Sequence, residues 1–252
     1  MGRLFIVFLL VFVVAGSVSA QQRVEGLDHI PVVVKDLARA TADFERLGFV
    51  LKPGRPHDNG LRNAHVKFAD GTEIELISPT AAIDALSVEY IEWLRDGDGP
   101  FSLGLYRPGS KNTPPPGVFF DARQHSPTDG PEHFEHPNSA VALSGVWLAG
   151  SPAERQLEKL PGAKVVGGAF CAPFGYGIRA VHFKDAELVL LPERMRIVRG
   201  RPIVAATVTV KHLLTAQGFL DAMRVRYRRE PGCGRNSLWV EAHGLWLEFL
   251  ER

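Results

Sequence analysis

The chain has little cysteine and lacks the short motifs that mark several common enzyme classes. It contains no G-x-S-x-G nucleophile elbow, no P-loop and no dinucleotide-binding glycine motif, so these three chemistries are not indicated. Its two cysteines, Cys171 and Cys233, lie in loops rich in glycine or proline and lack the C-x-x-C spacing of a metal or redox site. An oxidising compartment would permit a disulfide between them, but two unpaired thiols fit the sequence equally well.

A surplus of either charge is also missing. The chain has 29 lysines and arginines against 28 aspartates and glutamates, and Arg3 is the only charged residue among the first twenty. Nucleic acids and anionic membranes select basic surfaces, so we expect neither as a partner of the mature protein. We expect a small-molecule ligand instead, and either a monomer or a homodimer.

The apolar run at the N-terminus, Leu4–Val14, is shorter than the roughly 20 residues that a membrane span needs. Arg3 precedes the run, and the small residues Val18-Ser19-Ala20 follow it, as in a secretory signal peptide. We therefore predict that residues 1–20 are a signal peptide. The mature protein would begin near Gln21 and be secreted or periplasmic.

Residues 62–78, RNAHVKFADGTEIELIS, predict a β-hairpin. Two roughly alternating apolar runs flank Ala-Asp-Gly-Thr, a tight-turn signal in which Gly71 supplies a positive φ. We expect a three-residue loop, with Phe68 paired with Thr72. The remaining cross-strand pairs are then Lys67 with Glu73, His65 with Glu75, and Asn63 with Ile77.

This register separates apolar from polar side chains because side chains alternate across a strand. The apolar face carries Ala64, Val66, Phe68, Ile74 and Leu76. The opposite face carries Asn63, His65, Lys67, Glu73 and Glu75. A sheet with histidine, amide, lysine and carboxylate groups on one face is suited to binding a ligand.

The order strand, helix, strand, strand, strand recurs at a period near fifty residues, which indicates internal repeats. Arg62-Asn63 of the first repeat matches Arg235-Asn236 of the last, and Gly71 matches Gly244. We predict an α+β fold of three complete βαβββ units and one degenerate unit, forming curved half-barrel sheets with helices on the convex face. Residues 21–138 would hold the first and degenerate units, and residues 139–252 the other two.

Residues 107–138 are rich in proline, glycine, serine and histidine and show no periodicity. A segment of this length inside a compact domain predicts either a functional lid or a degraded repeat. His125, His133 and His136 lie here, and the spacing HFEH suggests a metal site. A solvated lid is the simpler interpretation.

The segments GLDHIPVVVKDL, HDNGLRN and FADGTEIELIS resemble the glyoxalase-like group of the vicinal-oxygen-chelate superfamily. HPNSAVALSGVWLAG, which starts at His136, resembles the second half of that group. The resemblance implies paired βαβββ units that curl into a cradle. In the metal-binding members, ligands come from the first and fourth strands of paired units, and the ion acts as a Lewis acid.

The resemblance places His29 at the first-strand ligand position and Glu75 at the fourth-strand position. Glu248 occupies the fourth-strand position of the last unit and counts as a ligand only if the first and last units pair. A His/carboxylate set of this kind suits one divalent ion such as Zn, Mn, Fe or Ni. The other ligand positions do not carry metal-binding residue types. In the third unit, for example, Ser144 or Gly145 occupies the first-strand position.

Each site residue also has a structural interpretation. His65 is either a ligand or a proton carrier, or it forms a plain cross-strand pair with Glu75, which Lys67 could neutralise as well. His57, Gly60 and Asn63 form the H-x-x-G-x-x-N pattern typical of the resembled group, where His57 and Asn63 would contact substrate, with Lys67 beside them. Alternatively, Gly60 and Asn63 only shape the loop.

Two functions follow from the resemblance. The first is a metal-dependent enzyme of the lyase, isomerase or dioxygenase type that acts on a small oxygenated molecule, with His65 and Glu75 as catalytic groups. The second is a non-catalytic protein that sequesters a small molecule, as resistance proteins of this superfamily do. The incomplete ligand set favours the binder, and the polar hairpin face favours the enzyme.

Overall fold

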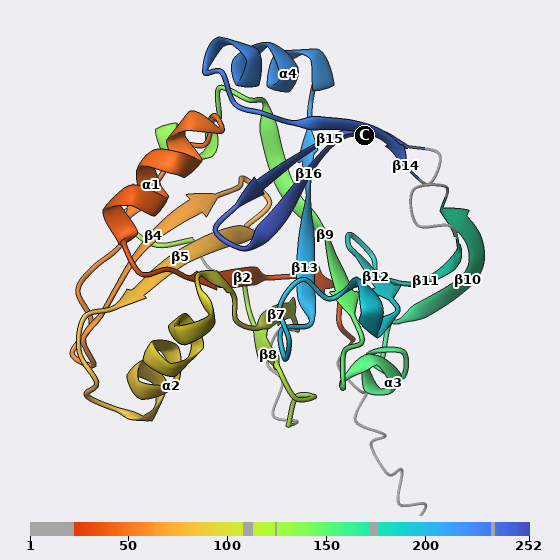
Figure 1. Cartoon of the computed structure of the whole chain (residues 1–252), viewed down its shortest axis with the longest axis horizontal. Helices are drawn as coiled ribbons and strands as arrows, with labels where there is room; N and C mark the ends of the chain where they lie inside the picture. The colour runs from red at the N-terminus through yellow and green to blue at the C-terminus, as the bar shows by residue number, and fades with distance from the viewer. Residues whose placement is uncertain (1–22, 108–112, 124, 172–175, 233–234) are drawn as a thin grey trace, which may run out of the picture.

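A computed structural model describes residues 23–107, 113–123, 125–171, 176–232 and 235–252. The predicted signal peptide and Cys233 lie outside these residues, as does the side chain of Cys171. The fold is α+β and contains a five-stranded sheet, an eight-stranded sheet and a small three-stranded sheet (Figure 1). Among the described residues, none of the helices is long and apolar enough to span a membrane.

The five-stranded sheet comes from the first hundred residues, in the order β3-β4-β5-β2-β6. Its strands are β2 (His29–Val33), β3 (Lys52–Pro53), β4 (Leu61–Lys67), β5 (Glu73–Pro79) and β6 (Gly99–Pro100). The hairpin register is confirmed, because His65 pairs with Glu75 and Lys67 with Glu73. The Phe68 amide donates to the Thr72 carbonyl at 3.0 Å, and Gly71 has the expected positive φ of 84°.

Helix α1 (Leu37–Arg46) follows β2 and begins where the sequence predicts it. The Asp36 carboxylate accepts a hydrogen bond from the Arg39 amide at 3.0 Å, which satisfies a backbone donor at the helix start. Gly48 follows the helix with a φ of 87°, a conformation that costs glycine little. Because these signals are local, the sequence alone was enough to predict the helix that follows β2.

The eight-stranded sheet joins two strand–helix–three-strand segments through β9 and β13, which pair in antiparallel fashion. The first segment contains β9 (Ala140–Ala149), α3 (Glu154–Leu157), β10 (Lys164–Cys171), β11 (Tyr176–His182) and β12 (Glu187–Leu191). The second contains β13 (Ile203–Val210), α4 (Leu213–Ala222), β14 (Arg228–Gly232), β15 (Arg235–Ala242) and β16 (Leu245–Glu251). Strand β14 begins only at Arg228, because the backbone amides of Arg224 and Val225 still donate to carbonyl oxygens at the end of α4.

The predicted lid segment is partly ordered into secondary structure. Strand β8 (Val118–Asp121) pairs in parallel with β7 (Leu103–Tyr106), and β7 also pairs with β1 (Gly26–Leu27), which completes the three-stranded sheet. The 3-10 turn η2 (Pro131–Phe134) follows; the other two such turns are η1 (Leu94–Asp96) and η3 (Glu193–Met195). The described part of residues 113–138 therefore contains one short strand, β8, and one 3-10 turn, η2, joined by loops.

One hydrophobic core unites both large sheets. The apolar hairpin face contributes Val66, Phe68, Ile74 and Leu76, and the eight-stranded sheet contributes Leu188, Leu247 and Phe249. All seven side chains are fully buried. Helices α1 and α4 pack into the same core through Phe44 and Leu220. We call the side of the five-stranded sheet that faces this core its back face.

Helix α2 (Ala85–Trp93) lies on the opposite side, the front face (Figure 1). Tyr90 packs there with Val33, Leu61 and Ile77, which alternate with the core residues along their strands. We expected the helices on the convex face of the sheets, opposite the polar hairpin residues, whereas α2 packs on the face that carries those residues. Its position leaves the polar hairpin residues between α2 and the segment 113–138.

Candidate functional site

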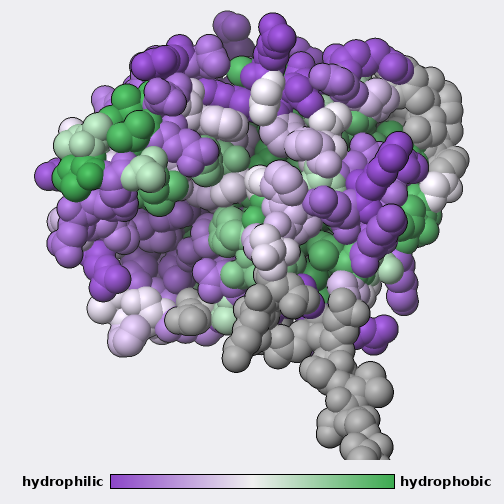
Figure 2. Space-filling view, turned by 90° about the horizontal axis from the view of Figure 1, so that it is seen from below, coloured by the Kyte–Doolittle hydropathy of each residue, from purple (hydrophilic) through white to green (hydrophobic). Residues whose placement is uncertain are grey.

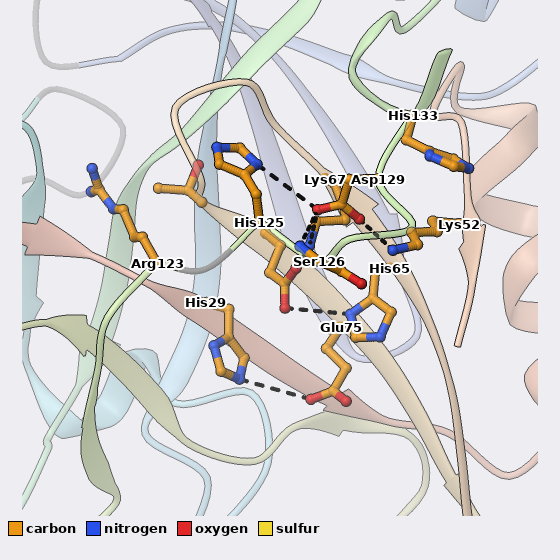
Figure 3. A network of polar contacts seen from close by, with 12 residues as sticks. His29, Lys52, His65, Lys67, Glu75, Arg123, His125, Ser126, Asp129 and His133 are labelled. Carbon is orange, nitrogen blue, oxygen red and sulfur yellow. Dashed lines mark hydrogen bonds and ion pairs between the residues drawn. The ribbon is translucent and has the colours of Figure 1, made fainter. Parts of the chain in front are cut away.

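The front face of the five-stranded sheet holds the site. Strands β2, β4 and β5 place His29, Asn63, His65, Lys67, Glu73 and Glu75 on this one face, as strand alternation requires. Figure 3 shows His29, His65, Lys67 and Glu75 gathered on this face, beside His125, Ser126 and Asp129 of the segment 113–138. Viewed from below, hydrophilic side chains line a hollow on this side of the molecule, next to apolar residues where Figure 1 places α2 (Figure 2).

His29 and Glu75 face each other across the site. Nε2 of His29 lies 3.8 Å from Oε2 of Glu75, and both side chains are about 15% exposed or less (Figure 3). Nδ1 of His29 bonds to the Asp28 carboxylate. Although burial disfavours the imidazolium, the Asp28 hydrogen bond and the charge of Glu75 raise the pKa of His29.

Asp28 is itself held in place. Strand pairing breaks between β1 and β2 at Asp28, which lets its buried side chain turn toward His29. The Arg123 amide donates to Asp28 Oδ2 at 2.6 Å, and the Arg123 guanidinium forms two bonds with Asp185 at 2.8 and 3.0 Å. The orientation of the His29 ring thus depends on residues almost one hundred positions away.

The edge of the His29 ring is covered by Phe119 of β8, at a centroid distance of 4.7 Å. Gly104 of β7 makes this contact possible, since a Cβ there would lie 2.7 Å from both the Phe119 ring and the His29 carbonyl oxygen. Strands β7 and β8 therefore supply one wall of the site. No local signal in the sequence placed Phe119 beside His29.

Glu75 is oriented by an amide rather than by a cation. Asn63 Nδ2 donates to Glu75 Oε1 at 2.7 Å. Tyr90 of α2 lies close enough for electrostatic coupling: burial, together with the charges of Glu75 and Glu89, raises the pKa of Tyr90. Neither Lys67 nor His65 is the observed ion-pair partner of Glu75, although the sequence left both open.

His65 and Lys67 instead contact Glu73. Nδ1 of His65 lies 3.3 Å from Glu73 Oε1, and the Lys67 ammonium lies 3.1 Å from Glu73 Oε2. Burial alone would favour the neutral acid, but the hydrogen bond from His65 and the charges of His65, His29 and Lys67 lower the pKa of Glu73 to about 2. Glu73 is thus ionised at neutral pH.

Asp129 of the segment 113–138 closes the far end of the site. Its carboxylate pairs with Lys52 and, at 3.1 Å, with Lys67, and it accepts the Ser126 amide at 2.7 Å (Figure 3). The Asp129 side chain is only 3% exposed. Burial by itself would raise the pKa of Asp129. The hydrogen bonds from Lys52, Ser126 and Lys67 and the charge of Lys67 outweigh this effect and lower the pKa of Asp129 to about 2. We call the cluster of Asp129, Lys52 and Lys67 the Asp129 latch.

The histidines of the segment do not converge on one point. His125 is exposed near Asp129, and His133 Nδ1 accepts the Gly130 amide at 2.9 Å. His136 is buried between Phe49 and Phe68. Its Nδ1 accepts the Val50 amide at 3.0 Å, and its Nε2 lies 3.0 Å from the Lys67 carbonyl oxygen, to which it donates. His136 therefore anchors the segment to the sheet.

His136 provides a pH-dependent test of this anchor. Burial lowers the pKa of His136. As pH falls below about 6.5, this histidine is therefore protonated in the unfolded chain before it is protonated in the native chain, which lowers the stability of the native state. We expect His136→Gln to lose stability at pH 7.5 and the gap to wild type to narrow toward pH 5, by up to about 1.4 kcal/mol per pH unit. Urea unfolding at several pH values measures this, with exposed His212→Gln as the control. A gap that widens at low pH would contradict the assigned neutral form.

His57 and Asn63 remain substrate-contact predictions. Nε2 of His57 and Oδ1 of Asn63 are buried without a hydrogen-bond partner among the described residues. Oδ1 of Asn63 packs against Gly54, where a Cβ would collide with it. A third such atom, Nδ1 of His65, lies 3.3 Å from the Glu73 carboxylate. Of the three atoms, Nε2 of His57 is therefore the best candidate for a ligand contact.

The structure does not bring Glu248 to His29 and Glu75. Glu248 lies on β16 of the eight-stranded sheet, is 1% exposed, and accepts a hydrogen bond from Thr207 Oγ1 at 2.6 Å. The last unit pairs with the third through β13 and β9, and not with the first. The condition under which Glu248 would join the His29 ligand set is therefore not met.

A cluster of Asp28, His29 and Asp121 also has ligand atoms within 4.8 Å of one another. Asp121 ends β8, so this cluster again depends on the pairing of β8 with β7. No sequence motif predicted Asp28, Asp121 or Asp129 as site residues. The only signal that pointed toward them was the position of Asp28 beside His29 and the acidic residues of the irregular segment.

Comparison with known proteins agrees with this architecture. The family model of the glyoxalase-like domain matches residues 27–104, which span β2 to β5 and α2. The match covers about a third of the chain and is to this one domain family. A comparison with curated protein sequences gave no significant match.

Solved structures share the fold of this protein at low sequence identity. A variant of 4-hydroxymandelate synthase from Streptomyces coelicolor has a TM-score of 0.61 and 12% identity over 91% of this chain and 93% of its own. Homoprotocatechuate 2,3-dioxygenase from Brevibacterium fuscum has a TM-score of 0.60 and 12% identity, over 93% of this chain and 82% of its own.

A larger protein shares the fold as well. It is a fusion of a xylose isomerase-like TIM barrel with 4-hydroxyphenylpyruvate dioxygenase, with a TM-score of 0.58 and 13% identity. The match covers 92% of this chain and half of the fusion protein. At these identities the comparison establishes the fold, and the chemistry must come from the site.

Proposed function

We propose that the protein is a metal-dependent enzyme that acts on a small oxygenated molecule at the front face of the five-stranded sheet. The observation that supports this best is the 3.8 Å separation of His29 Nε2 and Glu75 Oε2, with Asp28 on Nδ1 of the same ring. A histidine whose second nitrogen bonds to a carboxylate is the usual arrangement of a metal ligand. His29 and Glu75 thus fit two ligand positions and leave the others for water and substrate.

A divalent ion such as Zn, Mn, Fe or Ni held by His29 and Glu75 would supply Lewis-acid polarisation of a substrate oxygen. The protein's own groups would do the rest. Asn63 holds the Glu75 carboxylate, and Phe119 and Tyr90 limit access of water from two sides. His57 Nε2 would contact the substrate.

His65 is the proposed proton carrier. Nδ1 of His65 lies 3.3 Å from Oε1 of Glu73, and this carboxylate would favour the tautomer of the neutral ring with the proton on Nδ1 and the lone pair on Nε2. That is the form of a general base near neutral pH. Lys67 and the Asp129 latch would close the site on the side of His65.

A second function, sequestration without catalysis, is favoured by one observation. The ligand position that Glu248 occupies belongs to the eight-stranded sheet, where Glu248 bonds to Thr207. Only two of the resembled ligand positions therefore meet at His29. A binder would use the same front face to hold an organic ligand.

Metal analysis of the purified mature protein separates these functions. For the enzyme we expect about one divalent ion per chain and a loss of metal affinity of about 10–100-fold or more in Glu75→Ala. Asp121→Asn is the matched control, because it removes the carboxylate of the alternative cluster with Asp28 and leaves Glu75 in place. Metal lost from Asp121→Asn but kept in Glu75→Ala would move the site to that cluster. A metal-free, folded protein that an organic ligand stabilises would favour sequestration.

We also propose that the protein is exported after removal of residues 1–20. The positive residue, the apolar run and the small residues before Gln21 support this. N-terminal sequencing of the protein from its native cell checks it, and a mature chain that still begins at Met1 would contradict export by this route.

A further inference from the structure

A cleft of about 700 Å³ lies away from the front face, between α1 and the end of the chain. The start and one side of α1 form one wall, and the turn between β15 and β16 and the residues after α4 form the other. In Figure 1 the tip of the β15–β16 hairpin reaches toward the sheet beside α1. The cleft therefore lies where the first and last units meet, on the back side of the five-stranded sheet.

Basic side chains outnumber acidic ones by one in the lining. Lys35, Arg39, Arg46, Arg224 and Arg226 line the cleft, against Asp36, Asp43, Asp98 and Glu241. Three of these four acids are already engaged. Asp36 caps α1, and Asp43 and Asp98 hold the two ring nitrogens of His243 at 3.3 and 2.8 Å.

The basic groups are less well compensated. Arg39 and Arg46 share the single carboxylate of Asp43, at 3.7 and 3.9 Å. Within the part of the chain that the structure describes, the side chains of Lys35, Arg224 and Arg226 form no ion pair. Glu241 is the remaining acid of the lining, so the open part of the cleft carries a positive excess.

Two residues of the lining, Arg224 and His243, have positive φ of 54° and 50°. Arg224 stands just after α4, and His243 lies in the two-residue turn between β15 and β16. Both are usual places for this conformation, so the two segments of this wall turn at Arg224 and His243.

We propose that this cleft binds an organic anion with two negative charges. The forked guanidinium groups of Arg224 and Arg226 would bind the anionic group, since arginine matches phosphate and carboxylate oxygens in pairs. Val225 and Ala242, which are partly exposed, provide an apolar surface for the body of the ligand. The site is independent of His29 and Glu75 and does not rest on the proposed enzyme activity.

Calorimetric titration of the mature protein tests this site, with phenyl phosphate, inorganic phosphate and succinate as probes. We expect a dianion with a carbon body to bind, and the double variant Arg224→Gln/Arg226→Gln to weaken binding by about tenfold or more. Phenyl phosphate binding in preference to succinate identifies a phosphate ester, and the reverse order identifies a dicarboxylate.

The matched control is Arg155→Gln/Arg199→Gln, which removes the same charge from exposed positions outside the cleft. It should bind the probes as wild type does. Equal weakening in both double variants would reveal a general charge effect and overturn the proposal, as would no binding of any probe up to about 10 mM. Metal content serves as a separate readout, and we expect it to be unchanged in the Arg224/Arg226 variant.

Discussion

Replacing Phe68 by alanine is expected to lower the free energy of unfolding by about 3–5 kcal/mol. Phe68 is 0% exposed at the end of β4, with ring centroids 6.4 Å from Phe49 and 5.2 Å from His136. Alanine would leave a cavity between the sheet and the segment 113–138, because neighbours in a close-packed core relax only in part. Urea unfolding at neutral pH measures the loss.

Leu214→Ala is the control for this prediction. Leu214 lies in α4 and is 75% exposed, so its truncation removes little buried area and should change stability by less than about 0.5 kcal/mol. If Phe68→Ala were no more destabilising than Leu214→Ala, Phe68 would not lie in the core described above.

Replacing Asp129 by asparagine is expected to cost about 2–4 kcal/mol at pH 7. The change removes the charge from the Asp129 latch and leaves the Lys52 ammonium, whose side chain is 11% exposed, without its carboxylate. Lys67 keeps Glu73 at 3.1 Å, so the variant should still fold. We expect faster amide hydrogen exchange in residues 113–138 as the same contact is lost.

The acid limb of the stability curve provides a second readout for the latch. The native state lowers the pKa of Asp129 to about 2, so its contribution is complete above pH about 4 and disappears as pH falls toward 2. Asp129→Asn should therefore differ most from wild type at neutral pH and least near pH 2. Exposed Asp58→Asn is the control, and a pH-independent difference between Asp129→Asn and wild type would refute a charge-based latch.

The latch also connects stability with the proposed chemistry. Lys52 and Lys67 lie on strands of the first unit, and Asp129 comes from the segment that also carries Phe119 and Arg123. Closing this segment therefore places Phe119 on His29 and the Arg123 amide on Asp28. Opening of the latch would loosen the His29 environment without touching Glu75.

Much of the first unit was readable from the sequence because its signals are local. The turn at Gly71 and the alternation on both sides of it allow one register, since a slip by one residue would bury the charged face. Asp36 and Gly48 likewise bracket α1 through contacts within a few residues. The approach of His29 to Glu75 follows from the same alternation, once β2 lies beside β5.

The tertiary structure alone decided which distant segments complete the site. Asp129, Phe119 and Tyr90 reach the front face through packing across 30 to 90 intervening positions, and no periodic pattern encodes such contacts. Pairing of the last unit with the third, rather than the first, placed Glu248 in another sheet. Short-range hydrogen bonds and side-chain alternation thus determined the hairpin that carries the polar groups, whereas long-range burial determined which of those groups share one site.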